Sequence, residues 1–137
     1  MSVQKCFSGG RFEVIGSYAR GKRVGPYVFI AGTTAINEHN EVHAPGDAYE
    51  QTIFIMQRIE KALHELGAEL KHVVRTTAFL SDMQGGVMGF VKAHGEVFKG
   101  IDPVSTGVGA GLTRPGMMVE IQVDAIIHDG DGKLLDR

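Results

Sequence analysis

The sequence contains one cysteine, no tryptophan and four prolines among 137 residues. A single cysteine, Cys6, excludes both an intramolecular disulfide and a zinc site built from several thiolates. Charges of the two signs nearly balance, with 14 basic and 16 acidic residues, so no strong overall field attracts nucleic acid or an anionic membrane. No apolar run reaches the roughly 18 residues that span a bilayer, and the N-terminus lacks the apolar segment of a signal peptide. We therefore expect a cytoplasmic protein without a membrane partner.

The composition is that of one globular domain. Hydrophobic residues make up 43% and charged residues 22%, a balance that argues against disorder, collagen and a coiled coil. A chain of this length buries roughly two-thirds of the surface of its unfolded form, so it can hold a hydrophobic core. We expect a single domain over residues 1–137, without a linker or an internal repeat.

Two segments have the pattern of helices. In the first, apolar residues recur every three or four positions from Ile53 to Leu66, Asp47 is suited to cap the N-terminus, and Gly67 is suited to end the helix. The second covers about residues 86–99 and places His94 on its inner face, although internal glycines weaken it. The pattern leaves two roles open for His94, packing in the core or lining a cleft.

Five segments have the pattern of strands, namely residues 18–24, 26–31, 71–80, 104–110 and 117–127. The second of these is apolar throughout, so we expect it to be covered on both faces. After an irregular start, the order of elements is therefore β-β-α-β-α-β-β. It predicts an α+β sandwich of two layers, in which a mixed sheet carries both helices on one face.

The last two strands predict a distinctive surface. Alternation in residues 104–110 places Ser105, Gly107 and Gly109 on one side, as a bare strip over which a ligand or another backbone can come close. We expect this strip on the face without helices, beside Glu120 and Gln122 of the last strand. Such a face is more easily explained as a subunit interface with a cavity than as free surface.

Glu120 is the main candidate for chemistry. A carboxylate that points from a late strand into a covered, glycine-lined face is partly desolvated, which suits a general acid or base acting on a bound water. The alternative is a buried carboxylate satisfied by backbone N–H groups, or by Arg75 or Arg114 from a neighbouring segment. The residue pattern gives the two interpretations equal weight.

The other motifs favour structural roles. Residues 107–111 (GVGAG) do not open a helix, so nucleotide binding is not expected. The six histidines show no metal-binding spacing, and we expect no metal site. Basic residues gather near the N-terminus and leave RNA contact as a weak alternative to a solvated edge strand. They are Lys5, Arg11, Arg20, Lys22 and Arg23.

Four stretches resemble the RidA/YjgF family, whose older names include translation inhibitor and endoribonuclease L-PSP. They are residues 15–18 (IGSY), 28–32 (VFIAG), 73–77 (VVRTT) and 114–121 (RPGMMVEI), and the last is the most specific. The resemblance covers about residues 16–127 in the same order. It implies a chorismate-mutase-like fold and a barrel-shaped homotrimer with a ligand cleft at each subunit boundary. It also implies hydrolysis of reactive enamines and imines to keto acids and ammonia, without a metal or an organic cofactor.

The resemblance carries part of the family's site onto this chain. Tyr18 matches the cleft tyrosine, and Gly32, with Thr33 beside it, matches the glycine at the end of the second strand. Glu120 matches the catalytic glutamate. The resemblance therefore implies that Glu120 moves protons while Tyr18 and the backbone near Gly32 and Thr33 orient the substrate.

At other positions the chain departs from the family. Ser105 stands where the deaminases have an arginine that grips the substrate carboxylate, and Gly107 stands where a small polar residue or cysteine is frequent. Lys92 replaces an asparagine of some members, and Gln122 replaces a second glutamate. Losing a hydrogen bond to a charged group costs about 1.5–3 kcal/mol, roughly ten- to more than a hundredfold in affinity. We expect poor turnover of imines with a free carboxylate, unless Arg20, Lys92 or Arg114 binds that group from elsewhere.

Three functions follow, in decreasing order of preference. The first is a homotrimeric small-molecule hydrolase that adds water to a C=N bond, with Glu120 and Tyr18 as catalytic residues. Its substrate-binding residues are Gly32, Thr33, Ser105, Gly107, Lys92 and Arg114. The second is a trimer of the same shape that binds a metabolite without chemistry. The third is an endoribonuclease, against which the net charge of −2 counts.

Overall fold

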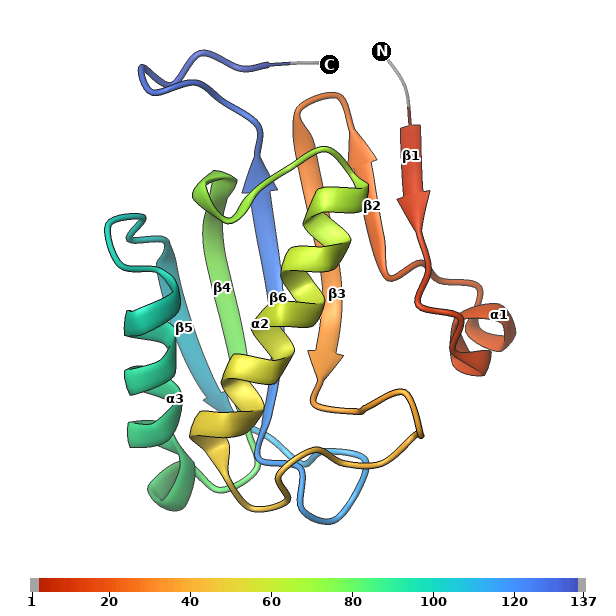
Figure 1. The fold of residues 1–137 in the computed structure, drawn as a ribbon, viewed down its shortest axis with the longest axis vertical. Coiled ribbons are helices and arrows are strands. Elements are labelled where there is room, and N and C mark those ends of the chain that lie inside the picture. The colour runs from red at the N-terminus through yellow and green to blue at the C-terminus, as the bar shows by residue number, and fades with distance from the viewer. Residues whose placement is uncertain (1–2, 136–137) are drawn as a thin grey trace.

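The computed structural model describes residues 3–135 as a six-stranded sheet with two long helices on one face (Figure 1). The elements are β1 (Val3–Cys6), α1 (Arg11–Gly16), β2 (Gly21–Val24), β3 (Tyr27–Thr34), α2 (Ala48–Glu65), a 3-10 turn (Leu70–His72), β4 (Val73–Leu80), α3 (Met83–Val97), β5 (Val104–Gly109) and β6 (Val119–Ile126). From β2 onward this is the predicted order. The α+β sandwich of two layers is therefore confirmed.

The strands lie in the order β1-β2-β3-β6-β4-β5. Strand β5 runs parallel to β4, whereas all other neighbours are antiparallel. A parallel pair needs a crossover connection, and α3 supplies it between β4 and β5. Strand β5 thus lies at one edge of the sheet, with α3 in front of it (Figure 1).

The core lies between α2, α3 and the sheet. Ile55, Ile59 and Leu63 of α2 are fully buried against the strands, and burying each such side chain contributes about 1.5–3 kcal/mol. The predicted ends of α2 are confirmed, because the Asp47 side chain accepts a hydrogen bond from the Glu50 N–H and Gly67 has φ +79°. Within the described residues, no helix combines the length and the apolar character needed to cross a membrane.

Three expectations about the strands and helices differ from the structure. The start of the chain is not irregular, since β1 pairs with β2, and α1 follows it at that edge of the sheet (Figure 1). Strand β3 is covered on one face only, because Tyr27 and Phe29 on its other face are 43% and 50% exposed. Helix α3 begins at Met83 rather than near residue 86, since the Asp82 side chain caps it by accepting from the Gly85 N–H.

The bare strip of β5 faces the helices, so the expectation that it shares a face with Glu120 is wrong. Its three residues pair with β4 residues whose side chains are buried under the helices: Ser105 with Thr76, Gly107 with Ala78, and Gly109 with Leu80. Paired residues on neighbouring strands share a face. Glu120 alternates with the buried Val119 and Ile121 and therefore lies on the opposite face. Alternation alone separates the two faces of a strand but does not say which one the helices cover.

Candidate functional site

Glu120 lies against the backbone of Gly32 on the face of the sheet without helices. Strand β3 has one residue more than β6 between the pairs Ile30–Val123 and Thr33–Ile121, which makes a β-bulge at this point. A Cβ added to Gly32 would lie only 2.2 Å from Glu120 Oε2. A glycine is therefore needed here for the half-buried carboxylate to come this close to the bulge.

The side chain of Arg20 holds the backbone of the bulge. Its Nη1 donates to the Gly32 carbonyl at 2.7 Å and to Thr33 Oγ1 at 3.3 Å, and its Nε lies 3.4 Å from Glu13 Oε2. Glu13 of α1 is only 5% exposed and also accepts from the Ser8 N–H and hydroxyl. The position of α1 is thus linked to the Gly32 carbonyl through two buried or half-buried charged groups.

A second guanidinium lies at the end of the same strand. Arg58 of α2 donates to the carbonyl of Thr34, the residue that pairs with Glu120. Burial, followed by the positive charge of Arg20, lowers the pKa of Arg58, while the charge of Glu13 acts in the opposite direction. Two arginines therefore fix the carbonyls of the β3 end beside Glu120.

A shallow hollow extends along the same face of the sheet. It is lined by Ala19, Gly21, Lys22, Phe29, Ile30, Ala31, Gln122 and Asp124. Glu120, Gln122 and Asp124 alternate along β6 and point to one side, so the hollow continues the surface on which Glu120 lies. An apolar floor from Phe29 with amide and carboxylate groups beside it suits a small molecule that carries both apolar and polar atoms.

Ser105 belongs to a different group of side chains, on the α3 side of the sheet. Thr76 Oγ1 donates to Ser105 Oγ at 2.8 Å and lies 2.9 Å from His94 Nε2. His94 is thus half-buried beside Phe90 and Phe98 and is linked to β5 only through Thr76. The sequence pattern missed Thr76, which carries no signal of its own until the register places it beside Ser105.

The remaining predicted residues are placed as follows. Tyr18 is 43% exposed in the segment between α1 and β2. Thr33 is only 1% exposed as a whole residue, so neither its side chain nor its backbone reaches the surface of a single chain. Lys92 Nζ lies 5.1 Å above the Tyr49 ring, and Arg114 donates twice to Asn40, at 2.7 and 2.6 Å. Lys92 and Arg114 are therefore engaged away from Glu120 and Ser105 in a single chain.

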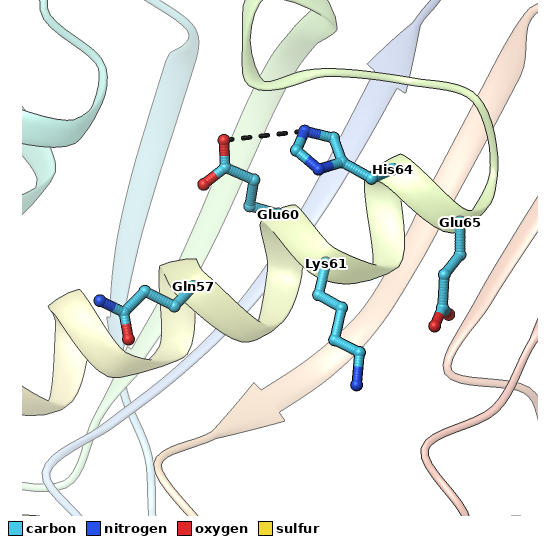
Figure 2. A pocket seen from close by; sticks show the side chains of 5 residues that line it. All are labelled: Gln57, Glu60, Lys61, His64 and Glu65. Carbon is cyan, nitrogen blue, oxygen red and sulfur yellow. Dashed lines mark ion pairs between the residues drawn. The ribbon is translucent and has the colours of Figure 1, made fainter.

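Another hollow, on the outer surface of α2, offers no comparable chemistry. Figure 2 shows its five lining side chains, Gln57, Glu60, Lys61, His64 and Glu65, all of which come from α2. The ion pair between His64 and Glu60, at 3.8 Å, joins two exposed groups one turn apart. Across residues 3–135, no three His, Cys, Asp or Glu side chains gather closely enough to hold a metal ion. The candidate functional residues are thus divided between Glu120 with Gly32 and Ser105 with Thr76.

Known proteins of similar sequence and structure share the α+β fold described above. A crystal structure of a YjgF/YER057c/UK114 family member from Mycobacterium tuberculosis has a TM-score of 0.81 and 36% identity, covering 91% of this chain and 99% of that one. An uncharacterised protein of Streptomyces coelicolor is 31% identical over 125 residues, 90% of this chain and 92% of its own. A RutC family protein of Pyrococcus abyssi is 29% identical over 128 residues, with 91% and 98% coverage.

The fold is that of a YjgF-type α+β protein. The family model described as Endoribonuclease L-PSP matches residues 9–127. The chain belongs to this family, and the resemblance to RidA/YjgF proteins is confirmed.

Proposed function

We propose that the protein is a small-molecule hydrolase of the RidA/YjgF type that adds water to the C=N bond of an imine, or of an enamine through its imine form. The position of Glu120 carries this proposal, since its carboxylate is held against Gly32 on a hollowed, half-apolar face. Such a carboxylate accepts a proton from water while the water oxygen bonds to carbon. It passes that proton to nitrogen, which gives a carbinolamine. The same carboxylate then accepts the carbinolamine hydroxyl proton as nitrogen takes a second proton and the C–N bond breaks, which releases a carbonyl compound and ammonia.

We propose further that the reaction takes place in a cleft between copies of the chain in a cytoplasmic homotrimer. Glu120 and Ser105 lie on opposite faces of one sheet, so one chain does not bring them together. A second copy whose β5 edge meets the face with Glu120 would do so. Exposed apolar side chains on that face, Tyr27 and Phe29, support burial against another copy.

In this proposal Tyr18 and the backbone of Gly32 orient the substrate. Ser105 takes the place of a charged clamp, and Gly107 leaves room beside it. Because Lys92 and Arg114 are engaged with Tyr49 and Asn40, the substrate that fits best has no free carboxylate to be gripped. The second candidate function is a trimer that binds a metabolite without chemistry. The engagement of Lys92 and Arg114 elsewhere favours it as well.

The test is a turnover assay with three variants. An amino-acid oxidase generates a panel of imino acids in the cuvette, uncharged imines are supplied directly, and formation of ammonia and of the carbonyl product is followed. Glu120→Gln is expected to lower turnover about 100-fold or more, because a general acid–base contributes that much. The matched control is Glu38→Gln, which removes a carboxylate that is 88% exposed in a loop and leaves turnover unchanged.

Size-exclusion chromatography and RNA cleavage complete the test. Glu120→Gln is expected to keep the oligomeric state of the wild type, so that a loss of turnover reports on chemistry. Ser105→Arg is expected to gain turnover of imines with a carboxylate. Retained turnover in Glu120→Gln would remove Glu120 from the reaction, and a ligand that binds but leaves unchanged would favour the binding trimer. RNA cleavage that disappears with Glu120→Gln would favour the endoribonuclease.

A further inference from the structure

A chain of hydrogen bonds runs beneath α3 from a half-buried imidazole to an exposed hydroxyl. Its members are His94 of α3, Thr76 of β4 and Ser105 of β5, joined by contacts of 2.9 and 2.8 Å at Thr76 Oγ1. Thr76 is fully buried, whereas Ser105 is exposed on the edge strand. The proposed proton transfers at Glu120 use neither Thr76 nor His94, so this chain needs an explanation of its own.

The His94 ring has a fixed orientation. It packs between Phe90 and Phe98, whose ring centroids lie 5.4 and 4.7 Å from its own. Burial lowers the pKa of His94, so the imidazole is neutral near pH 7 and carries one N–H. The ring therefore presents Nε2 to Thr76 either as a donor or as an acceptor. Which of the two applies depends on whether the single imidazole proton lies on Nε2 or on Nδ1.

The single proton of the threonine hydroxyl couples the two hydrogen bonds, so the distances allow two directions for the chain. In the direction that leaves Ser105 free to bind a ligand oxygen, Thr76 donates its proton to Ser105 Oγ. Thr76 must then accept from His94, which places the imidazole proton on Nε2. Because Ser105 Oγ accepts a hydrogen bond from inside the protein, its own proton is left to donate outward.

The surface beside Ser105 has room for a ligand. A Cβ added to Gly107 would meet no atom within 4 Å, and one added to Gly109 would meet only the end of the Met83 side chain at 3.9 Å. The strand therefore offers bare backbone next to a directed hydroxyl. A small group lying over Gly107 is within reach of Ser105 without displacing any other side chain.

We propose that Ser105 is an outward-directed hydrogen-bond donor, positioned by Thr76 and His94, that binds the neutral carbonyl oxygen of a small ligand lying over Gly107. This proposal rests on the proposed function for the reaction that the ligand undergoes, whereas the binding itself needs no turnover. A neutral carbonyl fits because a serine hydroxyl supplies one donor and no charge. A carboxylate would lose part of its hydration here without a cation to replace it. Imines that carry an amide or an ester group in place of a carboxylate are thus the class of substrate that the site selects.

The direction of the chain is tested by nuclear magnetic resonance on the full-length protein labelled with ¹⁵N-histidine. The His94 signals are expected to show a proton on Nε2 and none on Nδ1. Thr76→Val, which keeps the shape of the side chain and removes its hydroxyl, is expected to shift the His94 Nε2 signal. Thr77→Val is the matched control, because Thr77 is the next residue of β4 and faces the other side of the sheet; it should leave the signal unchanged.

The ligand class is tested by titrating pyruvamide and pyruvate as probes. Wild type is expected to bind pyruvamide more tightly than pyruvate. Ser105→Ala and Thr76→Val should each weaken pyruvamide binding about two- to tenfold, the range for one neutral hydrogen bond, and Thr77→Val should not. Ser105→Arg is expected to reverse the preference in favour of pyruvate.

Three results would overturn the proposal. A His94 ring with the proton on Nδ1 means that the chain runs the other way and that Ser105 donates inward. Labelling of Ser105 by a fluorophosphonate, detected by intact mass, would make it an activated nucleophile instead of a donor. Failure of pyruvamide to bind better than pyruvate would remove the neutral carbonyl as the ligand. None of these results depends on imine turnover, so they are separate from a failure of the proposed hydrolysis.

Discussion

Replacing Gly32 with alanine is expected to move the carboxylate of Glu120 without removing it. The new Cβ would lie 2.2 Å from Oε2 and 3.1 Å from Cδ of Glu120, whereas an ordinary non-bonded contact is about 3.5 Å. The bulge cannot easily yield, because Arg20 holds the Gly32 carbonyl at 2.7 Å. The carboxylate must therefore retreat by about 1 Å or more.

The effects on turnover and on stability should differ strongly. A displacement of about 1 Å at a catalytic group can lower the rate about 100-fold, which corresponds to roughly 2.7 kcal/mol of transition-state stabilisation. The free energy of unfolding should change by less than about 1 kcal/mol, because the displaced atoms form the end of a flexible, half-buried side chain. Gly32→Ala thus tests the effect of moving the Glu120 carboxylate while the carboxylate itself is retained.

The measurement combines imine turnover with urea unfolding at a fixed concentration of protomer. Gly111→Ala serves as the control, since a Cβ added there would meet no atom within 4 Å. It should leave both quantities close to those of the wild type. Wild-type turnover in Gly32→Ala would refute the inference that the contact between Glu120 and Gly32 is used in catalysis. A loss of stability as large as that of a core mutation would show instead that the bulge itself has been disrupted.

Two other predictions concern the scaffold. In α3, Gly95→Ala should raise the free energy of unfolding by about 0.5–1 kcal/mol because its Cβ meets open space. Gly89→Ala should lower it by about 1–3 kcal/mol because its Cβ would lie 2.9 Å from the Tyr49 backbone nitrogen; equal urea midpoints would contradict this account. Burial, followed by the charge of Lys71, lowers the pKa of His72 below 6.5, so the unfolded chain binds the proton first. The free energy of unfolding of the wild type should therefore fall as pH drops below about 6.5. The fall should be less steep in His72→Gln, whereas the exposed control His39→Gln should have the slope of the wild type. Identical slopes in all three proteins would refute the role of His72.

The two long helices and most strands could be predicted because their signals are local. Helix α2 has a complete apolar stripe, a capping aspartate and a terminating glycine within one stretch of sequence. Helix α1 gave no such signal because its pattern is inverted. Glu13 is its buried residue, while Phe12, Val14 and Ile15 are exposed. The ion pair with Arg20 stabilises the burial of Glu13, and hydrophobic periodicity does not report such a pair.

The candidate site was predicted in part for a related reason. The alternation of the last strand already indicated Glu120, and the resemblance indicated both Glu120 and Gly32. The structure places the two in contact. The prediction of the face on which Ser105 lies was wrong. That face depends on the register between β5 and β4, two strands separated in sequence by α3. The roles of Arg20 and Thr76 depend on contacts across strands and had no sequence signal.

The two candidate positions, Gly32 with Glu120 and Ser105, share one physical arrangement. A strand fixes the side to which a residue points but leaves its polar atoms free to rotate. At Gly32 the backbone is held by Arg20, which is held in turn by Glu13 of α1. At Ser105 the hydroxyl is held by Thr76, which is linked to His94 of α3. Each chain begins on a helix outside the strand. Its inner member, the half-buried Arg20 or the buried Thr76, links that helix to the strand. The short helix α1, which hydrophobic pattern does not reveal, is therefore as much a part of the site as the strand that carries Glu120.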